Sequence, residues 1–137
     1  MSLILLRIQD SPRIVFQRRD HNTDVYPGLL TFFGGRIDGG ESPREACIRE
    51  LSEETSLREV NLTEFEPLLL DVPFTLPNSR VVQVHLFSAK IHDADFTTYE
   101  GAGAEVFTID EVLIRTDVAE VARLLLQRVQ NLHSRTA

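Results

Sequence analysis

A helix start marked by several successive residues constrains this chain most, and it follows directly on a glycine-rich loop. Ser42 can act as the N-cap, Pro43 fills the first helical position, and Glu45 can reach back to the N-cap backbone. The stretch before it is a short apolar run, Leu29–Phe33, followed by a loop with four glycines. The segment therefore predicts a strand, a close turn of the backbone and a helix that runs to about Thr55.

Strands and helices are mixed along the rest of the chain. The predicted strands are Leu3–Ile8, Arg13–Arg18, Leu29–Phe33, Glu59–Leu70, Arg80–Lys90 and Ala104–Thr108. One helical turn is predicted at Asp110–Leu113, and Asp117 is predicted to cap a last helix with an apolar stripe at Val118, Val121, Ala122, Leu125, Val129 and Leu132. This mixture, with its long connections, predicts an α+β fold over residues 1–137 as a single domain. A central mixed β-sheet with helices on both faces is the natural packing.

Charge and cysteine content exclude several classes of function. The net charge of −7 argues against binding to a nucleic-acid backbone, which needs clustered Lys and Arg. The one cysteine, Cys47, cannot form an intrachain disulfide, and it fits a reducing, cytoplasmic setting. The apolar start, Leu3 to Leu6, is too short for a signal-peptide core or a membrane span. We expect a globular monomer or homodimer away from membranes, and this composition does not exclude small anionic substrates.

The predicted helix carries three carboxylates close together. Glu50, Glu53 and Glu54 have the i, i+3, i+4 spacing that places side chains on one stripe. On an exposed helix such residues repel one another by a few tenths of a kcal/mol per pair, and most such stripes are simply solvated. A shared Mg²⁺ or Mn²⁺ would reverse that repulsion, because hard cations prefer oxygen ligands. The glycine-rich loop ahead of the helix, which lets the backbone approach a ligand closely, favours the metal-binding interpretation.

The residues around these glutamates resemble the Nudix box. Gly35 is followed after five residues by Glu41, and after seven more by Arg49-Glu50-Leu51-Ser52-Glu53-Glu54-Thr55-Ser56-Leu57. Every defined position of the box matches except Ser56, which stands where the family has glycine. Glycine closes the helix there in a left-handed conformation, so we expect Ser56 to be strained by about 1 kcal/mol. The order of strands and helices is similar to the Nudix fold, an α/β/α sandwich, across nearly the whole chain.

The resemblance implies a role for each matching residue. Glu53 and Glu54 correspond to the principal metal ligands and Glu50 to a ligand that often acts through water. The carbonyl of Gly34 often completes the metal sphere, and Gly35 opens the box beside the substrate. Arg49 and Glu41 correspond to an internal ion pair that orients the catalytic helix and its loop. The implied cofactor is Mg²⁺ or Mn²⁺.

Residues outside the box supply further candidates. The family often adds a carboxylate from a downstream loop, and Glu100 is the first candidate, with Glu105 second. Arg19 ends the second predicted strand, where a similar arginine contacts substrate phosphate in some relatives, and Arg80 is a weaker candidate for the same role. For each of these residues a solvated surface position is the competing interpretation.

The function that the resemblance implies is metal-dependent hydrolysis of the diphosphate linkage in a nucleoside diphosphate joined to a group X. A nucleoside triphosphate is the first choice for the substrate, and a nucleotide sugar or a dinucleoside polyphosphate is possible. The general base is Glu50, Glu54 or Glu100. The alternative is a catalytically inactive Nudix-fold module that binds or senses nucleotides, although retention of all three helix glutamates argues against it. A relative acting on isoprenoid diphosphates is a weaker rival, because no partner cysteine motif supports it.

Overall fold

The computed structural model of the protein describes residues 1–136, and side chains as far as residue 133. Its strands and helices, in chain order, are β1 (Ser2–Ile8), β2 (Ile14–Arg18), β3 (Leu30–Thr31), β4 (Phe33–Gly35), α1 (Pro43–Glu54), the 3₁₀ turn η1 (Glu59–Asn61), β5 (Thr63–Thr75), β6 (Val81–Ile91), β7 (Ala104–Phe107), α2 (Ile109–Leu113) and α3 (Glu120–Thr136). None of the helices in this part of the chain is long and apolar enough to cross a membrane.

The strands form one mixed sheet. Its central path is β3-β2-β1-β6-β5, while β4 pairs with β1 and β7 with β2, which makes seven strands within residues 1–136. β1 pairs over its full length in parallel with residues 85–91 of β6, and the other pairs are antiparallel. The predicted α+β fold with a central mixed sheet is therefore confirmed.

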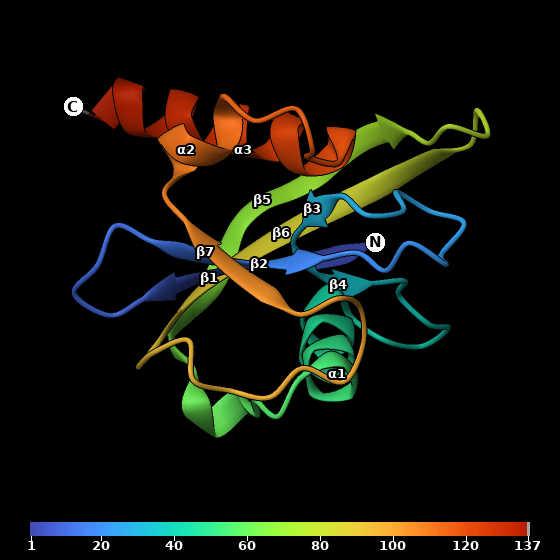
Figure 1. The fold of residues 1–137 in the computed structure, drawn as a ribbon. Helices are drawn as coiled ribbons and strands as arrows, with labels where there is room; N and C mark the ends of the chain where they lie inside the picture. The colour runs from blue at the N-terminus through green and yellow to red at the C-terminus, as the bar shows by residue number, and fades with distance from the viewer. Residues whose placement is uncertain (137) are drawn as a thin grey trace.

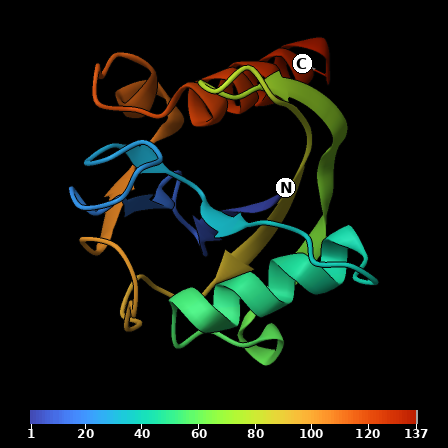
Figure 2. The same cartoon turned by 90° about the vertical axis from the view of Figure 1, so that its right-hand side faces the viewer.

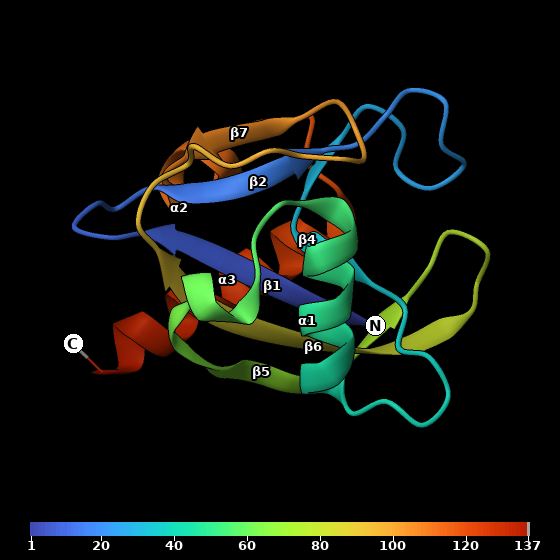
Figure 3. The same cartoon turned by 90° about the horizontal axis from the view of Figure 1, so that it is seen from below.

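Helices cover both faces of this sheet, as Figure 1 shows. Side chains alternate between the faces along each strand. In β1, Leu3 and Leu5 enter the core under α3, whereas Ile4 and Leu6 enter the core that includes Cys47 of α1. Figures 2 and 3 show α1 and α3 on opposite sides of the sheet. The alternation of apolar residues in the strands is thus the reason for the three-layer arrangement.

The start of α1 is built as the sequence predicts. The Glu45 N–H donates to Ser42 Oγ (3.1 Å), and the Ser42 N–H donates to a Glu45 carboxylate oxygen (2.9 Å). Pro43 follows at the first helical position, where a missing N–H costs nothing. The helix ends at Glu54, and Thr55 leaves it in an extended conformation.

Four details differ from the sequence prediction. The strand predicted at Glu59–Leu70 begins only at Thr63 and runs on to Thr75, because residues 59–61 form the 3₁₀ turn η1. The run Leu29–Phe33 is not one strand, because the chain crosses from β2, which pairs with β3, to β1, which pairs with β4. Asp117 does not cap the last helix, which begins at Glu120; its carboxylate instead binds Arg18 (2.9 Å) and Arg115 (2.8 Å). Leu132 lies outside the core and is 38% exposed, because the apolar stripe of α3 leaves the sheet near its end.

Candidate active site

The two glycines before the box are required by close contacts of the backbone. Gly34 lies in β4 beside β1 with φ +131°, and a Cβ there would lie 2.2 Å from the carbonyl oxygen of Ser2. Gly35 has ordinary backbone angles, but a Cβ there would lie 2.8 Å from the carboxyl carbon of Glu50. Only glycine allows β4 to pass this close to both β1 and the glutamate side of α1.

Glu54 is the buried member of the glutamate stripe. It is 3% exposed, and its carboxylate accepts a hydrogen bond from the Gly34 N–H (2.8 Å). Burial raises the pKa of Glu54 to about 8 against the effect of that hydrogen bond. The charges of Glu50 and Glu100 raise this pKa further, and Arg19 opposes them. Arg19 and Glu100, which are far from Glu54 in sequence, therefore lie close enough to change its pKa.

Glu50 shares this environment. Burial is the main cause that raises its pKa, and the charges of Glu53 and Glu100 act in the same direction. Arg49 opposes the rise through a hydrogen bond to the Glu50 carboxylate (3.1 Å). The Glu50 and Glu54 carboxylates thus lie on the β4 side of α1, partly desolvated and mutually repelling.

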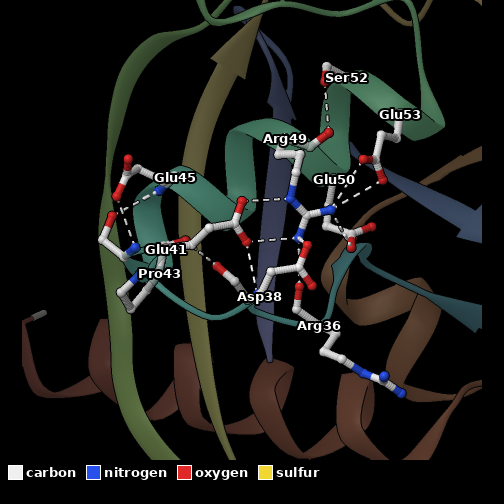
Figure 4. A network of polar contacts seen from close by, with 11 residues as sticks. Arg36, Asp38, Glu41, Pro43, Glu45, Arg49, Glu50, Ser52 and Glu53 are labelled. Carbon is white, nitrogen blue, oxygen red and sulfur yellow. Dashed lines mark hydrogen bonds and ion pairs between the residues drawn. The ribbon is translucent and has the colours of Figure 1, made fainter.

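Arg49 is the centre of the polar network that Figure 4 shows. It forms two hydrogen bonds with Glu41, of 2.6 and 2.9 Å, and these are the main cause that lowers the pKa of Glu41. Arg49 Nη1 donates to the carboxylate of Glu53 (3.2 Å), and Nη2, which also binds Glu41, donates to the carbonyl of Arg36 (2.9 Å). The ion pair that the resemblance implies between Arg49 and Glu41 is present. It joins α1 to the loop before it.

Sequence reasoning missed that Asp38 belongs to this network. Its carboxylate lies 3.4 Å from Arg49, and its backbone N–H donates to Glu41 (2.9 Å). No local pattern could have identified Asp38, because its place depends on how the loop folds back over the helix.

The three helix glutamates do not converge in this structure. Glu53 has a side chain that is 52% exposed and held by Arg49, whereas Glu54 is buried. Within the described residues, no group of three or more Asp, Glu, His or Cys side chains is arranged to hold a metal ion. The predicted ligands are therefore neighbours on one helix face, where Glu50 and Glu53 both bind Arg49 while Glu54 binds the Gly34 N–H.

The loop of residues 97–103 lies across the end of α1 and brings Glu100 to this region. The Tyr99 N–H donates to the carbonyl of Glu54 (2.7 Å). Glu100 is exposed, and its charge raises the pKa of Glu54. The second candidate, Glu105, is instead held by Arg18 in β2 through two hydrogen bonds of 2.6 and 2.9 Å. The structure thus leaves Glu100 as the loop carboxylate beside the glutamate helix.

Ser56 contradicts the expectation of a strained, left-handed helix end. It is not among the positive-φ residues of the described chain, and Thr55 before it is extended. The Ser56 N–H donates to the carbonyl of Thr97 (2.9 Å), and Ser56 Oγ accepts from the Thr97 N–H (3.0 Å). The expectation was wrong because the chain ends α1 by pairing with the 97–103 loop and needs no left-handed residue.

The two candidate phosphate-binding arginines lie in different places. Arg19 directly follows β2, and its guanidinium binds the Val25 carbonyl (3.2 Å) and Thr23 Oγ1 (2.9 Å). It holds the loop of residues 20–28 while its charge acts on Glu54. Arg80 is exposed in the turn between β5 and β6. Geometry therefore favours Arg19 over Arg80.

One cavity of the described residues lies away from this region. It has a volume of about 500 Å³ and is lined by residues such as Pro12, Ile109 and Gln130, near α2 and α3. Its lining is on the opposite side of the sheet from α1, and it shares no residue with the glutamate stripe. Charge and close packing, rather than cavity size, identify the candidate site.

A mixed sheet between two helices, with two glycines packed against a capped helix that carries Arg49 and three glutamates, defines a Nudix-type α+β domain. The comparison with known families agrees: the NUDIX domain matches residues 2–129, so the chain belongs to the Nudix family.

Individual relatives support this assignment. The chain is 32% identical over 94 residues to "Uncharacterized Nudix hydrolase orf19" of Rhodococcus erythropolis, a match that covers 64% of this chain and 49% of that protein. The match thus spans about half the length of this curated relative. Among solved structures, DR0079 from Deinococcus radiodurans has a TM-score of 0.78 at 23% identity, over 93% of this chain and 80% of that one. The MutT protein from Methanosarcina mazei Go1 also has a TM-score of 0.78, at 21% identity, over 96% and 92%. At these identities the two structures establish a shared fold.

Proposed function

We propose that this chain is a metal-dependent hydrolase that cleaves the diphosphate linkage of a nucleoside diphosphate joined to a group X, with a nucleoside triphosphate as the first choice. Membership of the Nudix family supports the reaction class. The observation that carries the proposal is the environment of Glu54, a buried carboxylate that is bound by the Gly34 N–H and repelled by Glu50 and Glu100. Such a concentration of negative charge is costly unless a cation neutralises it.

The residues present fit a divalent cation by their chemistry. The charge of Glu100 raises the pKa of both Glu50 and Glu54, the charge of Glu50 also raises that of Glu54, and a cation would remove this repulsion. Carboxylate and carbonyl oxygens are the donors that Mg²⁺ and Mn²⁺ prefer. The proposed ligands are Gly34 (carbonyl), Glu50, Glu53, Glu54 and Glu100. When bound, such an ion neutralises phosphate oxygens and lowers the pKa of a bound water.

The chain's own residues would then orient the reaction. Arg49, held by Glu41, fixes α1 against the loop that precedes it, and Gly35 leaves the Glu50 carboxylate room beside β4. Arg19 is the proposed contact to substrate phosphate, because its charge acts on Glu54 from the edge of the same region. Arg80 is the weaker candidate. The proposed general base is Glu50, Glu54 or Glu100. A cytoplasmic setting and a monomeric or homodimeric state stay predictions.

One observation favours the alternative, an inactive module that binds or senses nucleotides. Arg49 holds Glu53 in an ion pair, and within the described residues no three acidic side chains are arranged to hold a metal ion. In an active enzyme Glu53 must exchange this partner for a cation, whereas in an inactive module the ion pair persists. The two functions therefore differ in what Mg²⁺ does to Glu53.

A substrate panel with Mg²⁺ or Mn²⁺ tests the proposal. We expect turnover of at least one nucleotide that stops in excess EDTA, and we expect Glu53→Gln to lose most of it, because the amide lacks the charge that a hard cation needs. Glu66→Gln, which removes an exposed carboxylate from β5, is the matched control and should keep full activity. Full turnover in EDTA, or an unimpaired Glu53→Gln protein, contradicts the assignment.

A further inference from the structure

The buried polar side chains separate into two groups. Ser2, Glu54, Thr55 and His85 each form a side-chain hydrogen bond. Among the described residues, the buried polar side chains without any such bond are Gln17, Thr31 and Ser88. Gln17 is 2% exposed and Thr31 is 7% exposed. Because buried polar groups are nearly always hydrogen-bonded, these residues call for an explanation.

Gln17 and Thr31 are direct neighbours across two strands. They are register partners in the pairing of β2 with β3. Phe16 and Leu30, which precede them in the chain, point into the core under α3. Since successive side chains of a strand point to opposite faces, Gln17 and Thr31 both face the α1 side of the sheet.

This pair lies beside the candidate active site. Thr31 precedes Gly34 by three residues, which is roughly 10 Å of extended chain. The carboxamide of Gln17 packs against the loop that carries Glu100, because a Cβ at Gly101 would lie 3.4 Å from Gln17 Nε2. The two side chains therefore lie between Gly34, which binds Glu54, and the loop that carries Glu100.

The polar atoms of the pair keep a narrow opening to solvent. In the described part of the chain, two side-chain atoms are fully closed off from solvent and have no hydrogen-bond partner. They are Arg7 Nε and Tyr26 Oη. Neither belongs to Gln17 or Thr31, so the polar atoms of these two residues are unpaired but not sealed. An apolar residue at either position would fill the same space without leaving a polar atom unpaired.

We propose that Gln17 and Thr31 bind the polar edge of the substrate's nucleobase. This inference rests on the proposed function and adds which side chains would contact the base of the substrate. A carboxamide has two donor hydrogens and one acceptor, and a hydroxyl can donate and accept. Together they match a heterocycle that presents a donor beside an acceptor, as glutamine does when it binds adenine through two hydrogen bonds. The diphosphate then lies toward Gly34, Gly35 and the glutamates.

Two nearly isosteric variants, Thr31→Val and Gln17→Met, test the inference. For a nucleoside triphosphate we expect KM to rise by about 10- to 100-fold, because the donor and acceptor groups of the base would lose their hydrogen-bond partners on the protein. The inhibition constant of inorganic triphosphate, which has no base, should stay within about twofold. The thermal midpoint should stay level or rise, since each variant removes an unpaired polar group. Gln17→Glu, which replaces a donor by an acceptor, should change the order of preference among the bases.

Ser88→Ala is the matched control. Ser88 is also buried and without a side-chain hydrogen bond, but it lines a cavity with Leu5 on the α3 side of the sheet. Removing its hydroxyl should therefore leave KM unchanged. An unchanged KM in Thr31→Val and Gln17→Met, or a fall in thermal midpoint as their main effect, would overturn the inference, because the side chains would then serve the fold.

Failure of the proposed function is distinguishable from failure of this inference. If the wild-type protein hydrolyses no nucleotide, the proposed function fails. Calorimetric titration with a nucleoside triphosphate then measures binding directly. A loss of affinity of tenfold or more in Gln17→Met supports base binding, and equal affinity in wild type and variant refutes it.

Discussion

Replacement of Glu54 by glutamine should stabilise the metal-free protein, and the gain should increase with pH. The pKa of Glu54 is raised from 4.5 to about 8, first by burial and then by the charges of Glu50 and Glu100. A carboxyl group with a higher pKa in the folded than in the unfolded chain destabilises the fold once it ionises. The penalty is absent well below pH 4.5, grows up to about pH 8 and is constant above it.

The size of this effect follows from the two pKa values. Glu54 is ionised in the unfolded chain from about pH 5 upward but keeps its proton in the folded protein up to about pH 8, and this difference lowers the free energy of unfolding by about 1 kcal/mol at pH 5 and about 3 kcal/mol at pH 7. Glutamine carries no charge, and its amide oxygen can still accept the hydrogen bond from Gly34. Its amide N–H₂ group adds a cost of its own, but that cost does not depend on pH. The change with pH is therefore the diagnostic quantity.

Urea unfolding in EDTA at pH 5, 7 and 9 measures this difference between wild type and Glu54→Gln. Glu53→Gln is the control, because Glu53 is half exposed and bound by Arg49, and its effect should stay nearly constant with pH. Saturating Mg²⁺ should stabilise the wild type and narrow the gap to Glu54→Gln. A difference between wild type and Glu54→Gln that does not change between pH 5 and 9 would refute the reasoning, because the carboxylate would then not be desolvated.

The remaining predictions concern single contacts around the same helix. Ser56→Gly should lower the free energy of unfolding by about 1 kcal/mol, since it removes the Oγ hydrogen bond to the 97–103 loop and adds freedom to the unfolded chain; a rise in the urea midpoint would restore the idea of a strained serine. Glu100→Gln should cut turnover by about 10²–10⁴ at little cost in stability, and turnover within about threefold of wild type would show that Glu100 is only an exposed loop acid. Gly35→Ala should fold but lose about 10² in turnover, because its Cβ would displace the Glu50 carboxylate. Gly34→Ala should instead lower the thermal midpoint sharply, because its Cβ would meet backbone; equal behaviour of the two alanine variants would contradict the assigned contacts.

The sequence alone determined what depends on neighbours along the chain. The capping box of α1 involves Ser42 and Glu45 only, and its hydrogen bonds form whenever the helix does. The alternation of apolar residues predicted the strand β6. The same alternation determines which of its side chains enter the core on each face of the sheet. The residues from Gly35 to Glu54 carried the resemblance to the Nudix box. The spacing of Glu50, Glu53 and Glu54 placed their side chains on one stripe of the helix.

Only the tertiary structure decided which residues from distant segments of the chain contact one another. Ser56 is hydrogen-bonded to the loop after β6 and so closes the end of α1. Glu105 forms an ion pair with Arg18 of β2. The unpaired couple of Gln17 and Thr31 exists only because β2 lies beside β3 in one register. Such contacts join residues from separate strands and loops, and no local pattern specifies which of several similar side chains will be the neighbour. Burial of Glu54, and with it the rise of its pKa, likewise depends on the layer of chain that closes over α1.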